Sequence, residues 1–454
     1  MASDVPGGCG AYGFTSILTI VIVKLRQSGR GGRVGHLLMI ESWVGSMSSL
    51  LPQAIRESGD RFSFLTRDLQ HYLSAAPDVG HPLLVAANIV AAETNDEAAL
   101  LPWVKRLHQA LEFDGVLSSC DYYLPTVAAV AAELGLPGPS REAMAAACDK
   151  ARTRRICGAA GVPGPEFAIA AQVGDLIESA ERIGYPVVVK PVDLCGGMFV
   201  RRVDDVDELR AAIAEIAGFP VNARGQARPT EILVEECLRG PEYSVETVTF
   251  GGDTTVIGIT DKQVIGAPWF IEAGHMFPAV LEPEVQTHIA EVACAAIAVL
   301  GLDNTVAHTE IKLTASGPRL VEVNPRPAGN RITELVRRVT GIDLASVYAE
   351  LALGRKPDLT IRDTGVGSAA IAFLVPSQTG VLTGISGAER WVRDERIVDY
   401  DLAAPGKRVD AAQNNNGYLA HAMVVEEKPG AAGVSARDLI DSLRVSYDTA
   451  GVAG

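Results

Sequence analysis

Apolar and polar positions begin to alternate regularly at His36, and the first part of the pattern predicts a parallel sheet. Short apolar runs typical of buried strands are separated by stretches in which apolar residues recur at helical spacing. Alternating strands and helices are typical of a parallel sheet covered by helices. The predicted strands are 37–42, 62–66, 83–88 and 115–119, and the predicted helices are 47–57, 96–113 and 126–134. Such sheets bind ligands in loops at the carboxyl ends of strands, here 42–46 and 120–124, and the absence of GxGxxG argues against a dinucleotide.

The segment LPGPS, residues 136–140, separates this unit from a second one, because its prolines and glycine interrupt regular structure. The pattern then predicts a helix from Arg141 to Cys157 and a buried strand, VVVKP, that ends at Lys190. A strand over 242–250 alternates Glu242, Ser244 and Glu246 with apolar residues, and we expect those acids to face solvent. Further strands are predicted at 199–203 and 232–235, and another strand ends at Lys262. Residues 269–279 are expected to form a loop, and residues 286–300 a helix.

Two runs between Val306 and Arg331, VAHTEIKL and RLVEVNP, predict a hairpin whose loop is Thr314–Gly317. Helices are predicted at 332–340 and 343–353. From Gly367 the runs alternate in the manner of β-strands, and a closing helix is predicted at 435–447. The C-terminal part is therefore expected to be a separate, mostly β unit.

Length and charge narrow the classes of function. The chain has 454 residues, enough for roughly three or four domains. Its net charge of −15 argues against nucleic acid as the main partner, since phosphate binding requires clustered positive charge. Seven dispersed cysteines without CxxC spacing indicate reduced thiols in the cytoplasm.

Residues 1–33 lie outside the alternating pattern and are expected to be a poorly ordered extension. Their apolar run, Phe14–Val23, is too short to span a bilayer, and its basic residues follow the run, whereas a signal peptide carries them before it. No membrane partner is therefore expected, with a membrane-associated or extra-strand role as the alternative.

The hairpin carries the main candidate chemistry. A loop centred near Ser316 places Glu310 opposite Glu322, within one position, and Asn324 shares a face with Glu322. Two carboxylates and an amide suit a hard cation such as Mg²⁺, with Mn²⁺ as an alternative, and Arg326 follows on the same side. The alternative is a solvated hairpin face with cross-strand pairs.

A second candidate is the glycine pair that follows Lys190. Gly196 and Gly197 would let backbone amides approach a phosphate closely, and the lysine would add positive charge. Taken alone, the pair is more typical of an ordinary hairpin turn than of a phosphate loop.

Together these motifs resemble the ATP-grasp carboxylate–amine ligases over residues 36–450. Asp149-Lys150 resembles the first lysine motif, VVVKP the second, DLCGGM the flexible phosphate loop, VEECLRGPEYSVE the adenine hinge, and EIKL…VEVNPRPAGNR the metal hairpin. The resemblance implies an α/β (α+β) ATP-grasp fold. The implied units are the extension 1–33, an N-terminal α/β domain 34–138, an ATP-grasp domain 139–360 with a lid at about 165–238, and a β-rich domain 361–454.

The resemblance also implies roles for single residues. Lys150 and Lys190 would contact the α- and β-phosphates, and Arg326 would stabilise the acyl phosphate and the tetrahedral intermediate. The loop over the γ-phosphate would comprise Leu194, Gly196, Gly197 and Met198; the adenine hinge Glu235, Glu236, Cys237 and Leu238, with Glu242 on the ribose; and the metal ligands Glu310, Glu322 and Asn324.

Within the superfamily, ITDK and FIEAGHMFP resemble the substrate segment of L-amino acid ligases that form dipeptides. By that resemblance Glu272 and His275 would line the pocket of the amino-terminal substrate, and Lys262 would lie near the phosphates. Some members carry a bulky aromatic residue where this chain has Asn330, which implies a larger or more polar second substrate.

The expected function is ATP-dependent amide formation between an amino acid and an amine, releasing ADP and phosphate. One alternative is a biotin-carboxylase-type or purine-type ligase, although no Met-Lys-Met carrier motif is present. Another is a nucleotide-binding regulatory domain, disfavoured because every motif is intact. Members of the superfamily are often homodimers, but no segment dictates an interface.

Overall fold

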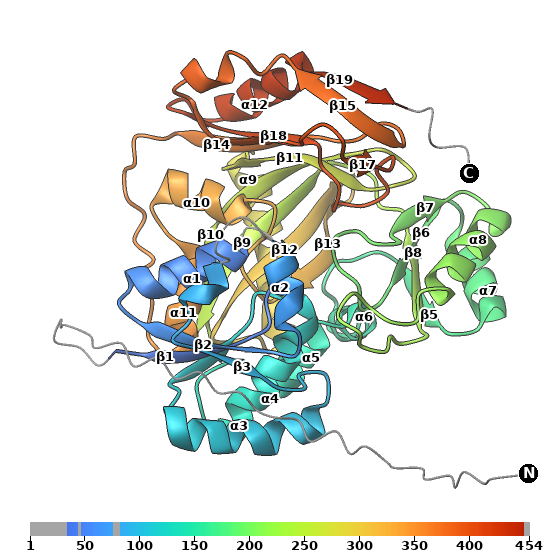
Figure 1. Ribbon diagram of the computed structural model, residues 1–454. Coiled ribbons are helices and arrows are strands. Elements are labelled where there is room, and N and C mark those ends of the chain that lie inside the picture. Colours follow the sequence, from blue (N-terminus) through green and yellow to red (C-terminus); the bar gives the residue numbers. More distant parts are fainter. Residues whose placement is uncertain (1–33, 44–46, 76–81, 449–454) are drawn as a thin grey trace, which may run out of the picture.

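The computed structural model describes residues 34–43, 47–75 and 82–448, so the predicted extension 1–33 lies outside the described residues. Its N-terminal part is a four-stranded parallel sheet in the order β3-β2-β1-β4, as predicted (Figure 1). The strands are β1 (His36–Ile40), β2 (Arg61–Thr66), β3 (Asn88–Ala91) and β4 (Gly115–Leu117), and the helices α1 (Met47–Glu57), α2 (Leu69–Ala75), α3 (Glu97–Leu111) and α4 (Leu124–Leu134).

Two predicted elements in this region are wrong. The predicted strand 83–88 is a 3-10 turn, Pro82–Val85, and the strand begins at Asn88, where it pairs with Ser63. The single helix 141–157 is two helices, α5 (Arg141–Ala147) and α6 (Lys150–Ala159). They separate because Asp149 adopts extended backbone and its side chain accepts a hydrogen bond from the amide of Arg152, which caps α6.

An eight-stranded sheet in the order β13-β12-β9-β10-β11-β14-β18-β16 forms the centre of the molecule. The first five strands are β9 (Glu242–Phe250), β10 (Asp253–Ile265), β11 (Ile271–Phe277), β12 (Thr305–Thr314) and β13 (Gly317–Asn324). The remaining strands are β14 (Ser368–Leu374), β16 (Ile397–Leu402) and β18 (Ala420–Glu426). Because β14 pairs with β11, the sheet runs across the predicted boundary at 360.

Alternate residues of the central strands pack on opposite faces of the sheet. Val306 packs with α10 (Ile332–Thr340) and α11 (Leu344–Ala352), whereas Ala307 packs with α9 (Pro283–Leu300). The helices 286–300, 332–340 and 343–353 expected from the sequence are therefore present. The sheet presents its α10–α11 face to the N-terminal unit, because α11 also packs on α1.

A smaller antiparallel sheet, β5-β8-β6-β7, projects to one side with α7 (Val173–Ile183) and α8 (Val206–Ala217) on it (Figure 1, green). Its strands are β5 (Phe167–Ala170), β6 (Val187–Pro191), β7 (Arg201–Val203) and β8 (Ile232–Glu236). The C-terminal strands β15 (Gly380–Ser386), β17 (Arg408–Val409) and β19 (Arg444–Asp448) form a third antiparallel sheet. The closing helix, α12, spans Ala431–Ser442, so the end of the predicted helix 435–447 is wrong: residues 444–448 pair with β15.

None of the helices in the described part of the chain is both long and apolar enough to cross a membrane.

The buried His36 in β1 makes the fold sensitive to acid. Its Nδ1 lies 2.9 Å from the carbonyl of Leu111 and its Nε2 lies 2.8 Å from Ser63 Oγ. Burial, helped by Arg61, lowers the pKa of His36 to about 4. Because the unfolded chain then binds a proton that the folded chain does not, stability is lost as pH falls from about 6.5 towards 4.

We therefore expect the free energy of unfolding to fall by up to about 3 kcal/mol more in the wild type than in a His36→Gln variant between pH 7 and 4. Urea titrations of both proteins across this range measure the difference. A gap between wild type and variant that does not change with pH would contradict the assignment.

Candidate active site

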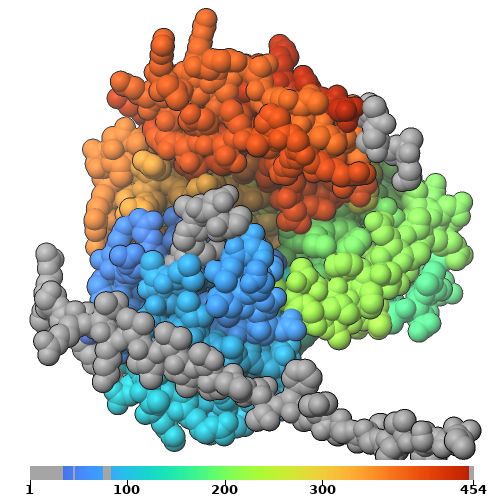
Figure 2. Space-filling model, in the orientation of Figure 1, coloured from blue at the N-terminus to red at the C-terminus, as the bar shows by residue number. Residues whose placement is uncertain are grey.

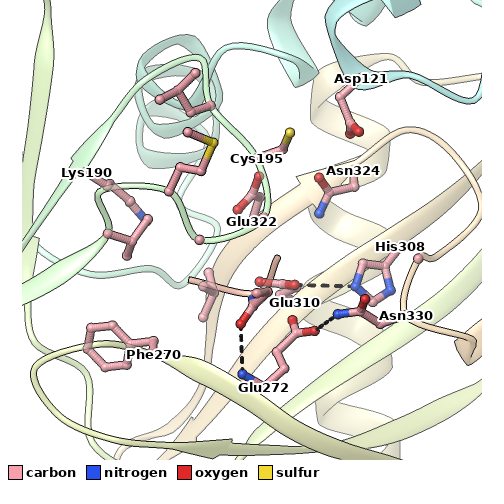
Figure 3. A pocket seen from close by; sticks show the side chains of 18 of the residues that line it. Asp121, Lys190, Cys195, Phe270, Glu272, His308, Glu310, Glu322, Asn324 and Asn330 are labelled. Carbon is pink, nitrogen blue, oxygen red and sulfur yellow. Dashed lines mark hydrogen bonds and ion pairs between the residues drawn. The ribbon is translucent and has the colours of Figure 1, made fainter. Parts of the chain in front are cut away.

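A cavity of about 760 Å³ opens between the central sheet, the small sheet, the N-terminal unit and the C-terminal loops (Figure 3). Most of the residues predicted from the sequence line it, and three do not: Cys237, Lys262 and His275. The predicted residues that line it are Lys150, Lys190, Leu194, Gly196, Gly197, Met198, Glu235, Glu236, Leu238, Glu242, Glu272, Glu310, Glu322, Asn324 and Arg326.

The hairpin β12–β13 places its acids on the cavity face by means of a β-bulge. Its two-residue turn pairs Thr314 with Gly317, and an uninterrupted register would set Glu310 opposite Val321. The register shifts after Glu310, so Glu310 pairs with Glu322 and His308 with Asn324. The extra residue turns Glu322 and Asn324 towards the cavity, because a bulge reverses the alternation of side chains beyond it. The predicted pairing of the two glutamates is confirmed.

Lys262 lies below the cavity wall and pairs with three carboxylates that line the cavity, one from each of β9, β11 and β12. Its Nζ lies 3.3 Å from Glu242 Oε1 and 3.0 Å from Glu272 Oε1, and it also donates to Glu310. Burial alone would lower the pKa of Lys262, but the three carboxylates raise it well above its usual range. The same ammonium holds the pKa of Glu272 well below its usual range, against the effect of burial. The lysine is charged and 3% exposed, below the cavity wall.

Lys150 links the hairpin to the glycine loop. The cap at Asp149 starts α6 so that Lys150 stands at its first position. Its Nζ lies 2.9 Å from Glu322 Oε1 and donates to the carbonyl of Leu194 at 2.6 Å. Burial would lower the pKa of Lys150, but Glu322 raises it. Lys150 therefore contacts both the hairpin that carries the predicted metal ligands and the loop that would cover a phosphate.

Lys190 is held by a carboxylate from the neighbouring strand. Its Nζ lies 2.5 Å from Glu235 Oε2, while the other oxygen of Glu235 accepts from Arg154. Burial, together with Arg154, lowers the pKa of Lys190, although Glu235 opposes the shift. Arg154 also donates to the carbonyl of the bulge residue Val321 at 2.6 Å. Glu235 thus orients Lys190 through its side chain, and Arg154 joins the small sheet to the bulge.

Asp121 and Trp43 complete the cavity beside Arg326, and neither was identified from the sequence. Arg326 Nε donates to Asp121 Oδ1 at 2.6 Å, and Trp43 Nε1 donates to Asp121 Oδ2 at 2.8 Å. Both lie in the loops after β1 and β4, where the sequence predicted that ligands would bind. The loops could be predicted, but no motif marked these two residues.

The segment with Glu272 and His275 is not a loop, and this prediction is wrong. Residues 271–277 form β11, an inner strand between β10 and β14. His275 is buried, and its Nε2 lies 3.3 Å from Glu272 Oε2, out of line for a hydrogen bond. Asn330 Nδ2 donates to the same Glu272 oxygen at 2.5 Å (Figure 3). Glu272 thus lines the cavity, whereas His275 is buried beside it and does not reach the cavity.

The expectation that the acids of β9 face solvent is also wrong. Glu246 is fully buried on the cavity face of the sheet and pairs with His308, whose Nδ1 lies 3.0 Å from Glu246 Oε1. Burial would lower the pKa of His308, but Glu246 raises it to about 9. The other ring nitrogen of His308, Nε2, lies 3.4 Å from Glu310 Oε1. Glu246 therefore holds His308 in contact with Glu310, one of the predicted metal ligands.

The donor set on the hairpin fits Mg²⁺. Glu310 and Glu322 supply carboxylate oxygens across one register position, and Asn324 supplies an amide oxygen from the next position on the same face. In the described ranges, no three His, Cys, Asp or Glu side chains cluster as a metal-ligand set. The ion would therefore need Asn324 and oxygens of a bound ligand to complete its coordination.

Family models match three consecutive parts of the chain. An ATP-grasp N-terminal domain matches residues 62–138, an ATP-grasp domain matches 183–334, and the L-amino acid ligase C-terminal domain 2 matches 372–448.

Among curated proteins, an uncharacterized protein of Sinorhizobium fredii is 31% identical over 336 residues, covering 71% of this chain and 68% of the relative. Alanine–anticapsin ligase of Bacillus subtilis is 26% identical, covering 69% of this chain and 73% of the relative. Carnosine synthase 1 of Mus musculus is 26% identical over 82% of this chain, but the chain spans only 46% of that relative's length.

Solved structures share the fold. An L-amino acid ligase from Bacillus licheniformis matches with a TM-score of 0.76 at 24% identity, covering 92% of this chain and all of the other. The biotin carboxylase domain of a Hydrogenobacter thermophilus 2-oxoglutarate carboxylase, in complex with MgADP and bicarbonate, matches with a TM-score of 0.65 at 16% identity, covering 91% of this chain and 90% of that one. The predicted ATP-grasp fold is confirmed by these matches, and the chain belongs to the ATP-grasp family, with the C-terminal domain of the L-amino acid ligases.

Proposed function

We propose that the protein is a ligase that uses Mg-ATP to join an amino acid carboxylate to an amine, through an acyl phosphate, with release of ADP and phosphate. One observation carries this proposal: a single cavity brings together the acidic hairpin face, the lysines Lys150 and Lys190, a glycine loop and Arg326. The family membership and the ligases among the relatives support the same reaction class.

At the nucleotide end, Lys150 and Lys190 would bind the phosphates. Both lysines are paired with carboxylates, Glu322 and Glu235, so they are held in place before ATP arrives. The loop from Leu194 to Met198 would cover the γ-phosphate. Residues 235–238 would bind the adenine through their backbone groups, and the Glu242 carboxylate would accept hydrogen bonds from the ribose hydroxyls.

Glu310, Glu322 and Asn324 would hold one or two Mg²⁺ ions between the β- and γ-phosphates, which neutralise charge on the transferring phosphoryl group. Lys150, which pairs with Glu322 before the ions bind, would then be free to face phosphate oxygens. Lys262 would stay paired with Glu242 and Glu272 below the cavity wall.

At the substrate end, Glu272 would bind the ammonium group of the amino acid, because its carboxylate faces the cavity and stays ionised beside Lys262. One carboxylate oxygen of that amino acid attacks the γ-phosphorus, and the bond to the β-phosphate oxygen breaks. The amine then attacks the acyl carbon, and the bond from carbon to phosphate oxygen breaks as the amine loses a proton. Arg326, fixed by Asp121, would stabilise the oxyanion of this second step.

The identity of the two substrates can be tested by phosphate release. Wild-type protein with Mg-ATP is incubated with a matrix of amino acids and amines, and products are weighed by mass spectrometry. We expect release that depends on an amino acid pair and a product mass equal to the pair minus water. Release that depends on bicarbonate alone would replace the proposal with a carboxylase.

A further inference from the structure

The C-terminal loop 410–417 closes over the glycine loop of the cavity. Figures 1 and 2 show the C-terminal segment (orange to red) meeting the segment that carries the small sheet (green). At this contact the backbone amide of Asn415 donates to the carbonyl of Gly196 at 3.1 Å. A segment more than two hundred residues away in sequence therefore fixes the backbone that would cover a phosphate.

The glycine pair is shaped to receive this loop. Gly196 and Gly197 have φ angles of 66° and 70°, which side chains other than glycine rarely adopt. A Cβ on Gly196 would lie 3.3 Å from Asn416 Oδ1, and one on Gly197 would lie 3.4 Å from Asn415 Nδ2. A side chain at Gly196 would therefore crowd Asn416, and both glycines lie in direct contact with the asparagines of the C-terminal loop.

The same asparagine also reaches the substrate end. Asn415 Oδ1 accepts a hydrogen bond from the backbone amide of Glu272 at 3.0 Å. Asn415 lines the cavity together with both glycines and Glu272. One residue is therefore bonded through its backbone to the glycine loop and through its side chain to the strand that presents Glu272.

We infer that Asn415 is a positioning residue that keeps the glycine loop closed over the acyl phosphate until the amine attacks. The inference rests on the proposed function, because it concerns the lifetime of that intermediate. An acyl phosphate exposed to water is hydrolysed: water attacks, the bond from carbon or phosphorus to the bridging oxygen breaks, and the free carboxylate and phosphate are released. Closing the site excludes this side reaction.

The test compares Asn415→Ala with Gln413→Ala, an exposed residue of the same loop. The measured quantity is phosphate released per amide bond formed, together with hydrogen exchange of the amides at 194–198 in the presence of Mg-ADP. Wild type and Gln413→Ala are expected to release one phosphate per amide. Asn415→Ala loses a hydrogen bond that is equivalent to about a fivefold change in an equilibrium constant, so its ratio should rise several-fold and its loop amides should exchange faster.

If Asn415→Ala folds poorly, Asn415→Ser takes its place. Serine keeps a small polar side chain that is too short to reach Glu272, so the same rise in the ratio of phosphate to amide is expected. A ratio that stays at one in both variants would overturn the inference, whether or not exchange increases. Failure of the proposed function would look different, because wild-type protein itself would then form no amide.

Discussion

Replacing Glu322 with Gln is expected to lower amide formation and ATP turnover by at least about a thousandfold while the protein stays folded. The carboxylate is one of two across the bulged register, and it faces both the cavity and Lys150. Its amide isostere keeps the shape but cannot neutralise a divalent ion. Steady-state phosphate release at saturating Mg-ATP measures the loss.

Glu291→Gln is the matched control, because it makes the same change at an exposed position of α9. Thermal unfolding should show both variants within a few degrees of the wild type. Near-normal turnover in Glu322→Gln would show that the metal assignment is wrong, and a parallel loss in Glu291→Gln would show that the change in charge acts on the whole protein.

Replacing Lys262 with Met is expected to cost about 3–5 kcal/mol of stability at neutral pH, because it leaves buried carboxylates without their cation. The lysine is the shared partner of Glu242, Glu272 and Glu310. Lys312→Met is the matched control: Lys312 is also on the sheet, and in the described part of the chain it forms an ion pair with one carboxylate, that of Glu242, at 3.1 Å. If the two variants lose the same amount of unfolding free energy, Lys262 is not the shared cation that stabilises the three carboxylates.

The effect of Lys262→Met should also depend on pH. In the wild type the pKa of Glu272 lies below its unfolded value, so the stability it gives is present at neutral pH and lost as pH falls. In the variant, burial without the ammonium raises that pKa above the unfolded value, so the folded form takes up a proton as pH falls. The gap in unfolding free energy between wild type and variant should therefore narrow from pH 7 towards pH 4 in urea titrations.

The sequence predicted the elements whose signals are local. Glu310 and Glu322 could be paired because a short loop fixes the register of a hairpin to within one position. The remaining uncertainty of one position was resolved by the bulge. The bulge forms because Leu320 and Val323, three positions apart, both pack against α9 on the face opposite the cavity. This packing can be seen only in the folded structure.

Features that depend on distant partners could not be predicted. Residues 271–277 do not alternate between apolar and polar side chains, because β11 is an inner strand that pairs with both β10 and β14, the latter about a hundred residues later, and is buried on both faces. Glu246 resembled a surface acid because its partner, His308, comes from another strand. Asp121 carried no motif, because its role depends on Arg326, which is brought to it by folding. The division into domains, the homodimer and the cytoplasmic location stay predictions.

The acyl-phosphate mechanism is tested most directly by following one oxygen atom. The amino acid that supplies the carboxylate, once identified, is labelled with ¹⁸O in its carboxyl group and incubated with Mg-ATP, the amine and the wild-type protein. Mass spectrometry of the released phosphate should show one labelled oxygen for each amide formed. Amide formation with unlabelled phosphate would contradict the account, because the carboxylate would then have been activated without attacking the γ-phosphorus.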